Sequence, residues 1–349
     1  MEPIVILGAG NSGLAMAAHL AMEGHQVRLW NRGSDMIEPL LQSPFIKVSG
    51  VINGEARLAL VTCDINEVIN GVSTILVTTP ASAHCDIAKI IAPCVTNEMF
   101  IVLNPGRTFG ALEFTAKLKE HGCVNNPLVI ETQTIIYTCR KTAYDQVNIL
   151  AFKNDVLYSA VDHNLNHNIM QRFPPCLQPF FKPAESMIET SIGNVGMILH
   201  CAPVLLNSGW VESSSKHFKY YWEGISPSVA RLLEKLDEER LQVARILGHP
   251  VESTTDWLRR SYGVEGKNLY ECIQNNPAYR TINAPSSLHH RYIMEDVSCG
   301  LVPLEAVGHS LGLPMRICGL IIDLANALLE MDFRKSGRVI EPESIFLPN

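Results

Sequence analysis

The sequence lacks any run of basic residues, any long uninterrupted apolar segment and any basic leader at its N-terminus. Its net charge is −7, and without a basic cluster we expect no nucleic-acid partner. The apolar run 317–331 carries Asp323 and Asn326, and it is too short and too polar to span a bilayer. The apolar N-terminus runs straight into glycines, so it predicts a strand and not a signal peptide. We therefore expect a soluble, cytoplasmic protein without a membrane partner.

Paired cysteines and metal-ligand spacings are also absent. The ten cysteines are scattered, with no CxxC pair, which is typical of free thiols in a reducing compartment. We therefore predict no metal site. The sequence is rich in apolar residues: 47% of its 349 residues are hydrophobic, and that length is enough for two domains.

Short β-rich runs alternate with helical stretches in the first half of the chain. The expected strands are apolar throughout, which is typical of strands covered on both faces, and they are 4–7, 27–30, 73–79, 99–104 and 128–131. Helical stretches at 12–23 and 82–92 separate several of them. This alternation predicts an α/β domain with a doubly wound, mostly parallel sheet. Two further runs, 147–153 and 156–161, could extend that sheet.

A cluster of prolines marks the domain boundary. Four prolines lie within 173–185, and the pattern beyond them becomes helical. We therefore predict an α/β domain over 1–183 and an all-α domain over 184–349.

The second half shows the start and stop signals of helices. The segment 226–248 has apolar residues at helical spacing, Ser226 as its N-cap and Gly248 at its end. Further helices are expected after Pro303 and after Pro314. These signals support the all-α prediction for this half.

The stretch "VILGAGNSG" (5–13) places three glycines between the first strand and the first helix. The first glycine permits the tight turn, the second lets a phosphate approach the backbone, and the third lets helix and strand pack closely. This context predicts a dinucleotide site, although a glycine turn without a ligand is the alternative. The predicted contacts are Gly8, Gly10, Asn11, Ser12 and Gly13.

The end of the second strand bears on the choice of cofactor. An NAD site usually has an acidic residue there to hold the ribose hydroxyls, but this chain has Asn31 and Arg32. An arginine can bind a 2′-phosphate, so we predict NADP(H), with NAD(H) possible. In the alternative, Arg32 is a solvated loop residue and Asp35 reaches the ribose.

Two further loops follow the expected strands 73–79 and 99–104. Loops at the carboxyl ends of parallel strands border the ligand crevice, so Thr79, Pro80 and Asn104 are candidate contacts of the nicotinamide side. Ordinary Pro/Gly turns are the alternative at each position.

One histidine lies in an otherwise apolar stretch, "NVGMILHCAPVLL" (194–206), that is typical of a buried helix. His200 is either a core residue or a group that moves a proton, for which its pKa range is suited. Arg291 and Asp296 lie in a second, helix-like stretch. An arginine can bind a carboxylate and an aspartate can orient a histidine, although a solvated helix face is the alternative.

Several of these segments together resemble the octopine/nopaline dehydrogenase family of opine dehydrogenases, over nearly the whole chain and closer to the bacterial octopine-synthase type. The resemblance is carried by "ILGAGNSG" at the N-terminus, "NPGR" (104–107), "GNVGMILH" ending at His200, "DEERL" (237–241) and "HHRYIMEDV…GLVP" (289–303). In the family a proline commonly follows the histidine, whereas here Cys201 follows it and Pro203 comes two residues later.

The resemblance implies a Rossmann domain followed by an all-helical domain, and an activity. Members use NAD(P)H to condense the amino group of an amino acid reductively with a 2-oxo acid such as pyruvate or 2-oxoglutarate. By resemblance, His200 is the catalytic acid/base, Asp296 its partner and Arg291 the ligand of the 2-oxo acid carboxylate. Gln133 is a further candidate substrate ligand. The expected partners are small-molecule substrates, and a homodimer is compatible with the sequence.

Two other functions are compatible with a dinucleotide site. The first is a simple 2-oxo acid reductase of the ketopantoate-reductase type, but those enzymes use a lysine on an early helix of the second domain. No lysine lies between 183 and 215. The second is a non-catalytic nucleotide-binding protein, which the set of His, Arg and Asp residues argues against.

Overall fold

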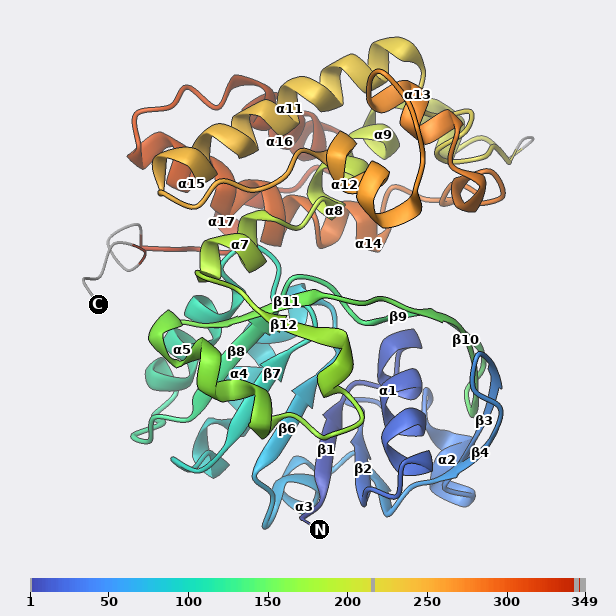
Figure 1. The fold of residues 1–349 in the computed structure, drawn as a ribbon, viewed down its shortest axis with the longest axis vertical. Helices are drawn as coiled ribbons and strands as arrows, with labels where there is room; N and C mark the ends of the chain where they lie inside the picture. The colour runs from blue at the N-terminus through green and yellow to red at the C-terminus, as the bar shows by residue number, and fades with distance from the viewer. Residues whose placement is uncertain (1, 215–216, 342–344, 346–349) are drawn as a thin grey trace. The chain divides into compact units, whose positions relative to one another are not determined.

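The chain forms two compact units, one ending at Ser191 and one beginning at Ile192. The computed structural model describes residues 2–214, 217–341 and 345. The first unit contains both β-sheets, and the second is built from helices (Figure 1). This confirms the predicted fold class, an α/β domain followed by an all-α domain.

An eight-stranded sheet forms the centre of the first unit. Its spatial order is β12-β11-β8-β7-β6-β1-β2-β5, and only the β11–β8 pairing is antiparallel. The bounds are β1 Ile4–Leu7, β2 Val27–Trp30, β5 Leu60–Thr62, β6 Thr74–Val77, β7 Phe100–Leu103, β8 Leu128–Thr132, β11 Val156–Ala160 and β12 Phe181–Pro183. The register pairs Leu7 with both Trp30 and Val77, and Val77 with Leu103. Four neighbouring strands, β2, β1, β6 and β7, therefore end at the same height in the sheet. The loops that follow them lie together at the carboxyl edge of the sheet.

A second sheet of four strands was not predicted. Its order is β4-β3-β10-β9, and its strands are β3 Phe45–Gly50, β4 Gly54–Arg57, β9 Tyr137–Ala143 and β10 Gln146–Phe152. The run 147–153 therefore does not extend the main sheet, whereas the run 156–161 does, as β11. Burial alternates along β9 because only one face of the strand is covered.

Helix α1 (Asn11–Met22) lies between the two sheets. It contacts β1 and β2 of the main sheet and all four strands of the second (Figure 1). Eight of its twelve residues are buried, which is why small and apolar residues fill it. The remaining helices of this unit are α2 Glu38–Gln42, α3 Ile65–Ile69, α4 His84–Ile91, α5 Gly110–Glu120, α6 Asn166–Ile169 and α7 Met187–Ile192, the last of which contains the boundary.

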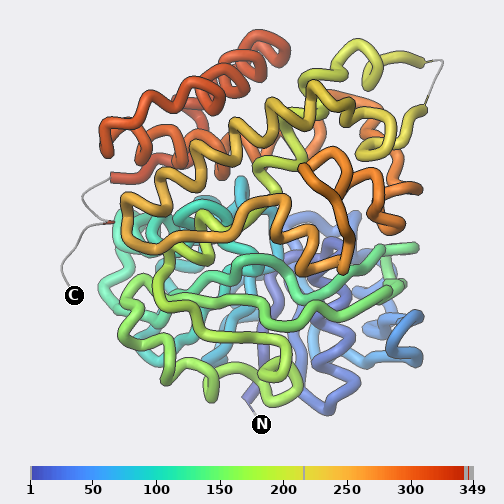
Figure 2. Tube along the Cα trace, turned by 45° about the horizontal axis from the view of Figure 1, so that its top comes forward, coloured from blue at the N-terminus to red at the C-terminus, as the bar shows by residue number. Residues whose placement is uncertain are grey.

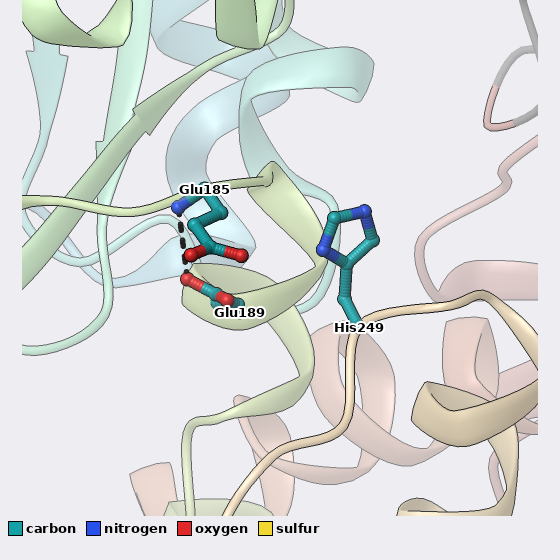
Figure 3. A group of neighbouring side chains, drawn as sticks. All are labelled: Glu185, Glu189 and His249. Atoms are coloured by element: carbon teal, nitrogen blue, oxygen red, sulfur yellow. Dashed lines mark hydrogen bonds between the residues drawn. The ribbon is translucent and has the colours of Figure 1, made fainter.

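Helix α7 begins with a local hydrogen bond that satisfies a free backbone donor. The backbone N–H of Glu185 donates to the carboxylate of Glu189 at 3.0 Å (Figure 3). Such side-chain bonds stabilise helix starts, where the first N–H groups have no partner within the helix. His249, drawn in the same figure, belongs to the second unit.

The second unit is built around α11 (Pro227–Ile246), which lies alongside α16 (Arg316–Leu329) (Figure 2). Ser226 caps α11 by accepting from the N–H of Val229, as predicted. The other helices are α8 Gly196–Leu199, α9 Cys201–Leu206, α10 Ser208–Val211, α12 Thr254–Tyr262, α13 Leu269–Gln274, α14 Arg291–Met294, α15 Val302–Ser310 and α17 Phe333–Ser336. The helices expected after Pro303 and Pro314 are α15, which has Pro303 in its first turn, and α16.

Within the described residues, one helical stretch has the length and composition to cross a membrane. It is Met187–Leu206, and 89% of its most apolar window is buried within the protein. Core helices of globular proteins share these properties, so the stretch is weak evidence for a membrane span.

Candidate functional site

The glycine turn after β1 has the geometry that a dinucleotide site requires. Gly8 has φ +113°, and a Cβ there would lie 2.9 Å from a methyl carbon of Thr79. A Cβ on Gly13 would lie 1.8 Å from the carbonyl oxygen of Gly8, so only glycine lets helix and strand pack this closely. A Cβ on Gly10 would meet nothing within 4 Å, which leaves open space above the turn. The turn therefore fits a bound pyrophosphate.

The N-terminus of α1 supplies the donors for that phosphate. The N-cap of α1 is Gly10, and no side chain caps the helix. The first N–H groups of the helix, which include those of Asn11 and Ser12, therefore remain available to an anion.

The loops after β6 and β7 lie at the same edge of the sheet. The Thr78 hydroxyl donates to the carbonyl oxygens of Leu7 and Gly8, both at 3.1 Å, and so ties the β6 loop to the glycine turn. The neighbouring Thr79 hydroxyl is buried without a hydrogen-bond partner in the described part of the chain, which fits a ligand that supplies one. Pro80 is exposed beside it.

Asn104 has a structural role in its loop. It is 2% exposed, and its side-chain amide donates to the carbonyl of Val102 at 3.1 Å. The side chain therefore holds the end of β7 from within. Its contact with the nicotinamide stays a prediction.

The residues at the end of β2 provide no carboxylate at the position where an NAD site usually has one. The Asn31 side chain accepts from the N–H of Ala9 at 3.2 Å and donates to the carbonyl of Gly33 at 2.8 Å. Arg32 forms an ion pair with Asp86 at 2.9 Å, and the two side chains are 61% and 60% exposed. Such an exposed pair contributes little to stability, so a phosphate can replace it.

Two lysines of this unit were not singled out from the sequence. The Nζ of Lys141, on β9, donates to the carbonyls of Ala9 and Met36. The partly buried Lys153, after β10, donates to Thr134, and burial lowers the pKa of its ammonium group to about 8. Lys141 has no local sequence signal, because strand β9, which brings it to the glycine turn, was not predicted.

In the second unit, His200 lies at a break between two short helices. The single buried helix expected over 194–206 is wrong: α8 ends at Leu199 and α9 begins at Cys201. Pro203 is the physical reason, since it has no N–H to donate to the carbonyl of Leu199. The hydroxyl of Tyr220 donates to that carbonyl at 3.4 Å, and also to the carbonyl of His200.

The imidazole of His200 is held by Asp296. Its Nδ1 lies 2.8 Å from a carboxylate oxygen of Asp296, and the two side chains are 19% and 1% exposed. No hydrogen-bond partner of Nε2 is found among the described residues, so the second ring nitrogen is available to a substrate. A carboxylate in this position fixes the ring's orientation and tautomer.

Asp296 does not lie on a regular α-helix with Arg291. Helix α14 ends at Met294, and a π-helical turn follows over Val297–Leu301, in which the N–H of Leu301 donates to the carbonyl of Asp296 at 2.9 Å. Such π-turns are frequent at functional sites. The turn lets Asp296 bond His200 while Arg291 has a different partner.

Arg291 and Tyr292 complete this cluster. The guanidinium of Arg291 is 56% exposed and lies 3.6 Å from the carboxylate of Glu295. The ring of Tyr292 stacks on His200 with centroids 4.3 Å apart, and the guanidinium carbon of Arg291 lies 5.1 Å from the same ring. Sequence reasoning missed Tyr292, although it stands directly beside Arg291. Gln133, the other candidate substrate ligand, follows β8 in the first unit.

The chain matches known proteins in both units. Residues 3–106 match the family model of the NAD-dependent glycerol-3-phosphate dehydrogenase N-terminus. Residues 183–329 match the family model described as NAD/NADP octopine/nopaline dehydrogenase, alpha-helical domain. The protein therefore binds NAD or NADP.

Individual relatives extend over almost the whole chain. The opine dehydrogenase of Arthrobacter sp. (strain 1C) is 37% identical over 96% of this chain and 93% of its own length. Protein ocs of Agrobacterium tumefaciens (strain Ach5) is 25% identical over 97% of this chain and 94% of its own. The structure of an NADP+-bound yersinopine dehydrogenase shares the fold, with a TM-score of 0.80 and 14% identity over 99% of this chain and 95% of that one. The chain belongs to the opine dehydrogenase family, the NAD(P)-dependent oxidoreductases that condense the amino group of an amino acid reductively with a 2-oxo acid.

Proposed function

We propose that the enzyme uses NADPH to join an amino acid to pyruvate or 2-oxoglutarate, with His200 as its acid/base group. The observation that carries this proposal is the 2.8 Å contact between His200 and the buried Asp296, with the second ring nitrogen available. An imidazole held in this way can take up a proton at its second nitrogen and return it, as an acid/base group must.

In this proposal His200 handles the protons of the condensation. Its Nδ1 donates to Asp296, which leaves Nε2 as the acceptor. Nε2 takes the proton that the amino group loses as its nitrogen attacks the carbonyl carbon. It returns that proton to the former carbonyl oxygen, which becomes the carbinolamine hydroxyl. A second proton, taken up by Nε2 from solvent, then passes to that hydroxyl, which leaves as water and so forms the protonated imine. Bound NADPH supplies the hydride that reduces the imine to a secondary amine.

Arg291 is the proposed ligand of the 2-oxo acid carboxylate. We expect Arg291→Met to raise the KM for the 2-oxo acid about tenfold with a smaller effect on kcat, because a half-exposed ion pair is partly screened by water. The measurement is steady-state kinetics with each substrate varied in turn. The matched control is Arg231→Met, which removes an exposed arginine of α11 whose guanidinium bonds only Ser228 among the described residues. An equal rise in the KM for the 2-oxo acid in both variants, or no rise in Arg291→Met, contradicts the proposed role of Arg291 as the carboxylate ligand.

The preference for NADPH is supported by the charges at the end of β2. Asn31 carries no charge that repels a phosphate, and in the described part of the chain Arg32 is held by an exposed ion pair with Asp86. The yersinopine dehydrogenase of similar fold has NADP+ bound, which supports the proposal. We expect wild-type kcat/KM to be at least about tenfold higher with NADPH than with NADH, in line with one additional charged hydrogen bond.

The experiment that tests the proposed function is a substrate screen. NADPH consumption is followed with a panel of 2-oxo acids against the twenty amino acids, and the products are identified by mass spectrometry. Consumption that needs both substrates supports the proposal. Consumption with a 2-oxo acid alone, or with no pair at all, contradicts it.

The proposed cellular location is the cytoplasm. All ten cysteines are free thiols in the structure, which a reducing compartment maintains. The homodimer that the sequence allows stays a prediction.

A further inference from the structure

We propose that Lys141 binds the 2′-phosphate of NADPH, an inference that rests on the proposed preference for that cofactor. The Nζ of Lys141 lies 3.1 Å from the carbonyl oxygen of Ala9 and 3.3 Å from that of Met36. Ala9 belongs to the glycine turn, and Met36 belongs to the segment that follows β2. These are the two segments between which the adenosine ribose is held in dinucleotide-binding folds.

Strand β9 holds Lys141 at the glycine turn through its backbone. The N–H of Lys141 donates to the side-chain oxygen of Asn11, the first residue of α1, at 2.7 Å. Two residues earlier, the thiol of Cys139 contacts the backbone carbonyl of Asn11 at 3.4 Å. Because side chains alternate along a strand, Cys139 and Lys141 share the face that packs on α1, whereas Arg140 is exposed on the other face.

The ammonium group of Lys141 is partly buried, and the described residues place no counterion within hydrogen-bond distance of it. Among the described residues, both of its hydrogen-bond partners are neutral carbonyl oxygens, and none is a carboxylate. The ring of Tyr144 lies 4.7 Å from the Nζ and limits its access to water. Burial lowers the pKa of this ammonium group because the positive charge loses part of its hydration. A bound anion would stabilise that charge.

The neighbouring groups favour the 2′-phosphate over the pyrophosphate as the anion. The pyrophosphate is accommodated by the free N–H groups at the start of α1. Met36, in contrast, lies beyond the segment of Asn31 and Arg32, where the ribose is expected. Lys141 and Arg32 would then contact the same phosphate from β9 and from the end of β2.

The test compares the affinities of two cofactors for the same variants. Lys141→Ser and the matched control Arg140→Ser each remove one positive charge from adjacent positions on opposite faces of β9. The dissociation constants of NADPH and NADH are measured by calorimetry, with 2′,5′-ADP and 5′-AMP as fragments that differ in the 2′-phosphate. We expect Lys141→Ser to weaken NADPH and 2′,5′-ADP about tenfold or more and to leave NADH and 5′-AMP within about twofold. Lys141→Arg should retain the preference, and Arg140→Ser should resemble the wild type.

The outcomes separate this inference from the proposed function. Equal weakening of NADPH and NADH in Lys141→Ser would assign the lysine to the pyrophosphate or to the fold, and it overturns the inference. An unchanged NADPH affinity overturns it as well, while the proposed function stands. A wild-type enzyme that binds NADH as tightly as NADPH overturns the cofactor preference itself, and with it the inference.

Discussion

Replacing His200 with asparagine is expected to lower kcat about 100- to 10,000-fold, the usual range for removal of a general acid/base group. Asparagine fits the space at the break between α8 and α9 but cannot exchange a proton. The affinity for NADPH should stay within about twofold, because the glycine turn belongs to the other unit. The measurement combines single-turnover kinetics with the dissociation constant of NADPH.

The same experiment includes two further variants. Asp296→Asn should also lower kcat, and the double variant should be little worse than His200→Asn, because the pair acts as one unit. The control is His309→Asn, an exposed histidine of α15 in the same unit, which should retain wild-type turnover. Turnover that survives in His200→Asn would remove this residue from the mechanism.

Replacing Asp237 with alanine is expected to lower the free energy of unfolding of the protein by about 3–5 kcal/mol, since it leaves a buried arginine without its counterion. Asp237 and the fully buried Arg240 lie 2.8 Å apart on α11. Arg240 also donates to the carbonyls of Ile192 and Glu252, both at 2.8 Å, and Asp237 accepts from the N–H of Thr254 at 2.7 Å. The Asp237–Arg240 pair therefore joins α11 to two other segments of the unit, one at Ile192 and one at Glu252–Thr254.

The measurement is urea unfolding followed by tryptophan fluorescence. The matched control is Glu238→Ala, the next residue of α11, whose ion pair with Arg245 is about half exposed on both sides. That change should cost less than about 1 kcal/mol. A similar small loss in Asp237→Ala would contradict the structural role that we assign to the "DEERL" segment.

The main sheet could be predicted because its central strands consist mostly of apolar residues. Runs such as 4–7 and 99–104 are covered on both faces, so nearly every residue in them is apolar and the run can be recognised in the sequence. The second sheet could not be found in the same way. β3 and β4 mix apolar and polar residues because only one face of each strand is covered, and β3 pairs in parallel with β10, about a hundred residues further along the chain. Nothing local in the sequence encodes that pairing.

The candidate site shows the same limit. The sequence alone predicted the glycine turn, because its strand, its glycines and its helix follow one another along the chain. The contact of His200 with Asp296 joins residues 96 positions apart; the residue types made it possible, and the resemblance to a family pointed to it. The contact of Lys141 with Ala9 spans 132 positions and depends on β9, so the sequence offered no signal for it. Tyr292 was missed because it stacks on His200, 92 positions earlier, and nothing in the local sequence marks that contact.

Isotope transfer tests the central claim most directly. The enzyme is supplied with pyruvate, its preferred amino acid and NADPH that carries deuterium at both C4 positions, and the product is analysed by mass spectrometry and NMR. We predict one deuterium per product molecule, on the former carbonyl carbon of pyruvate, in a secondary amine that retains the amino acid's nitrogen. Deuterium found instead in lactate, with the amino acid unchanged, would contradict the account.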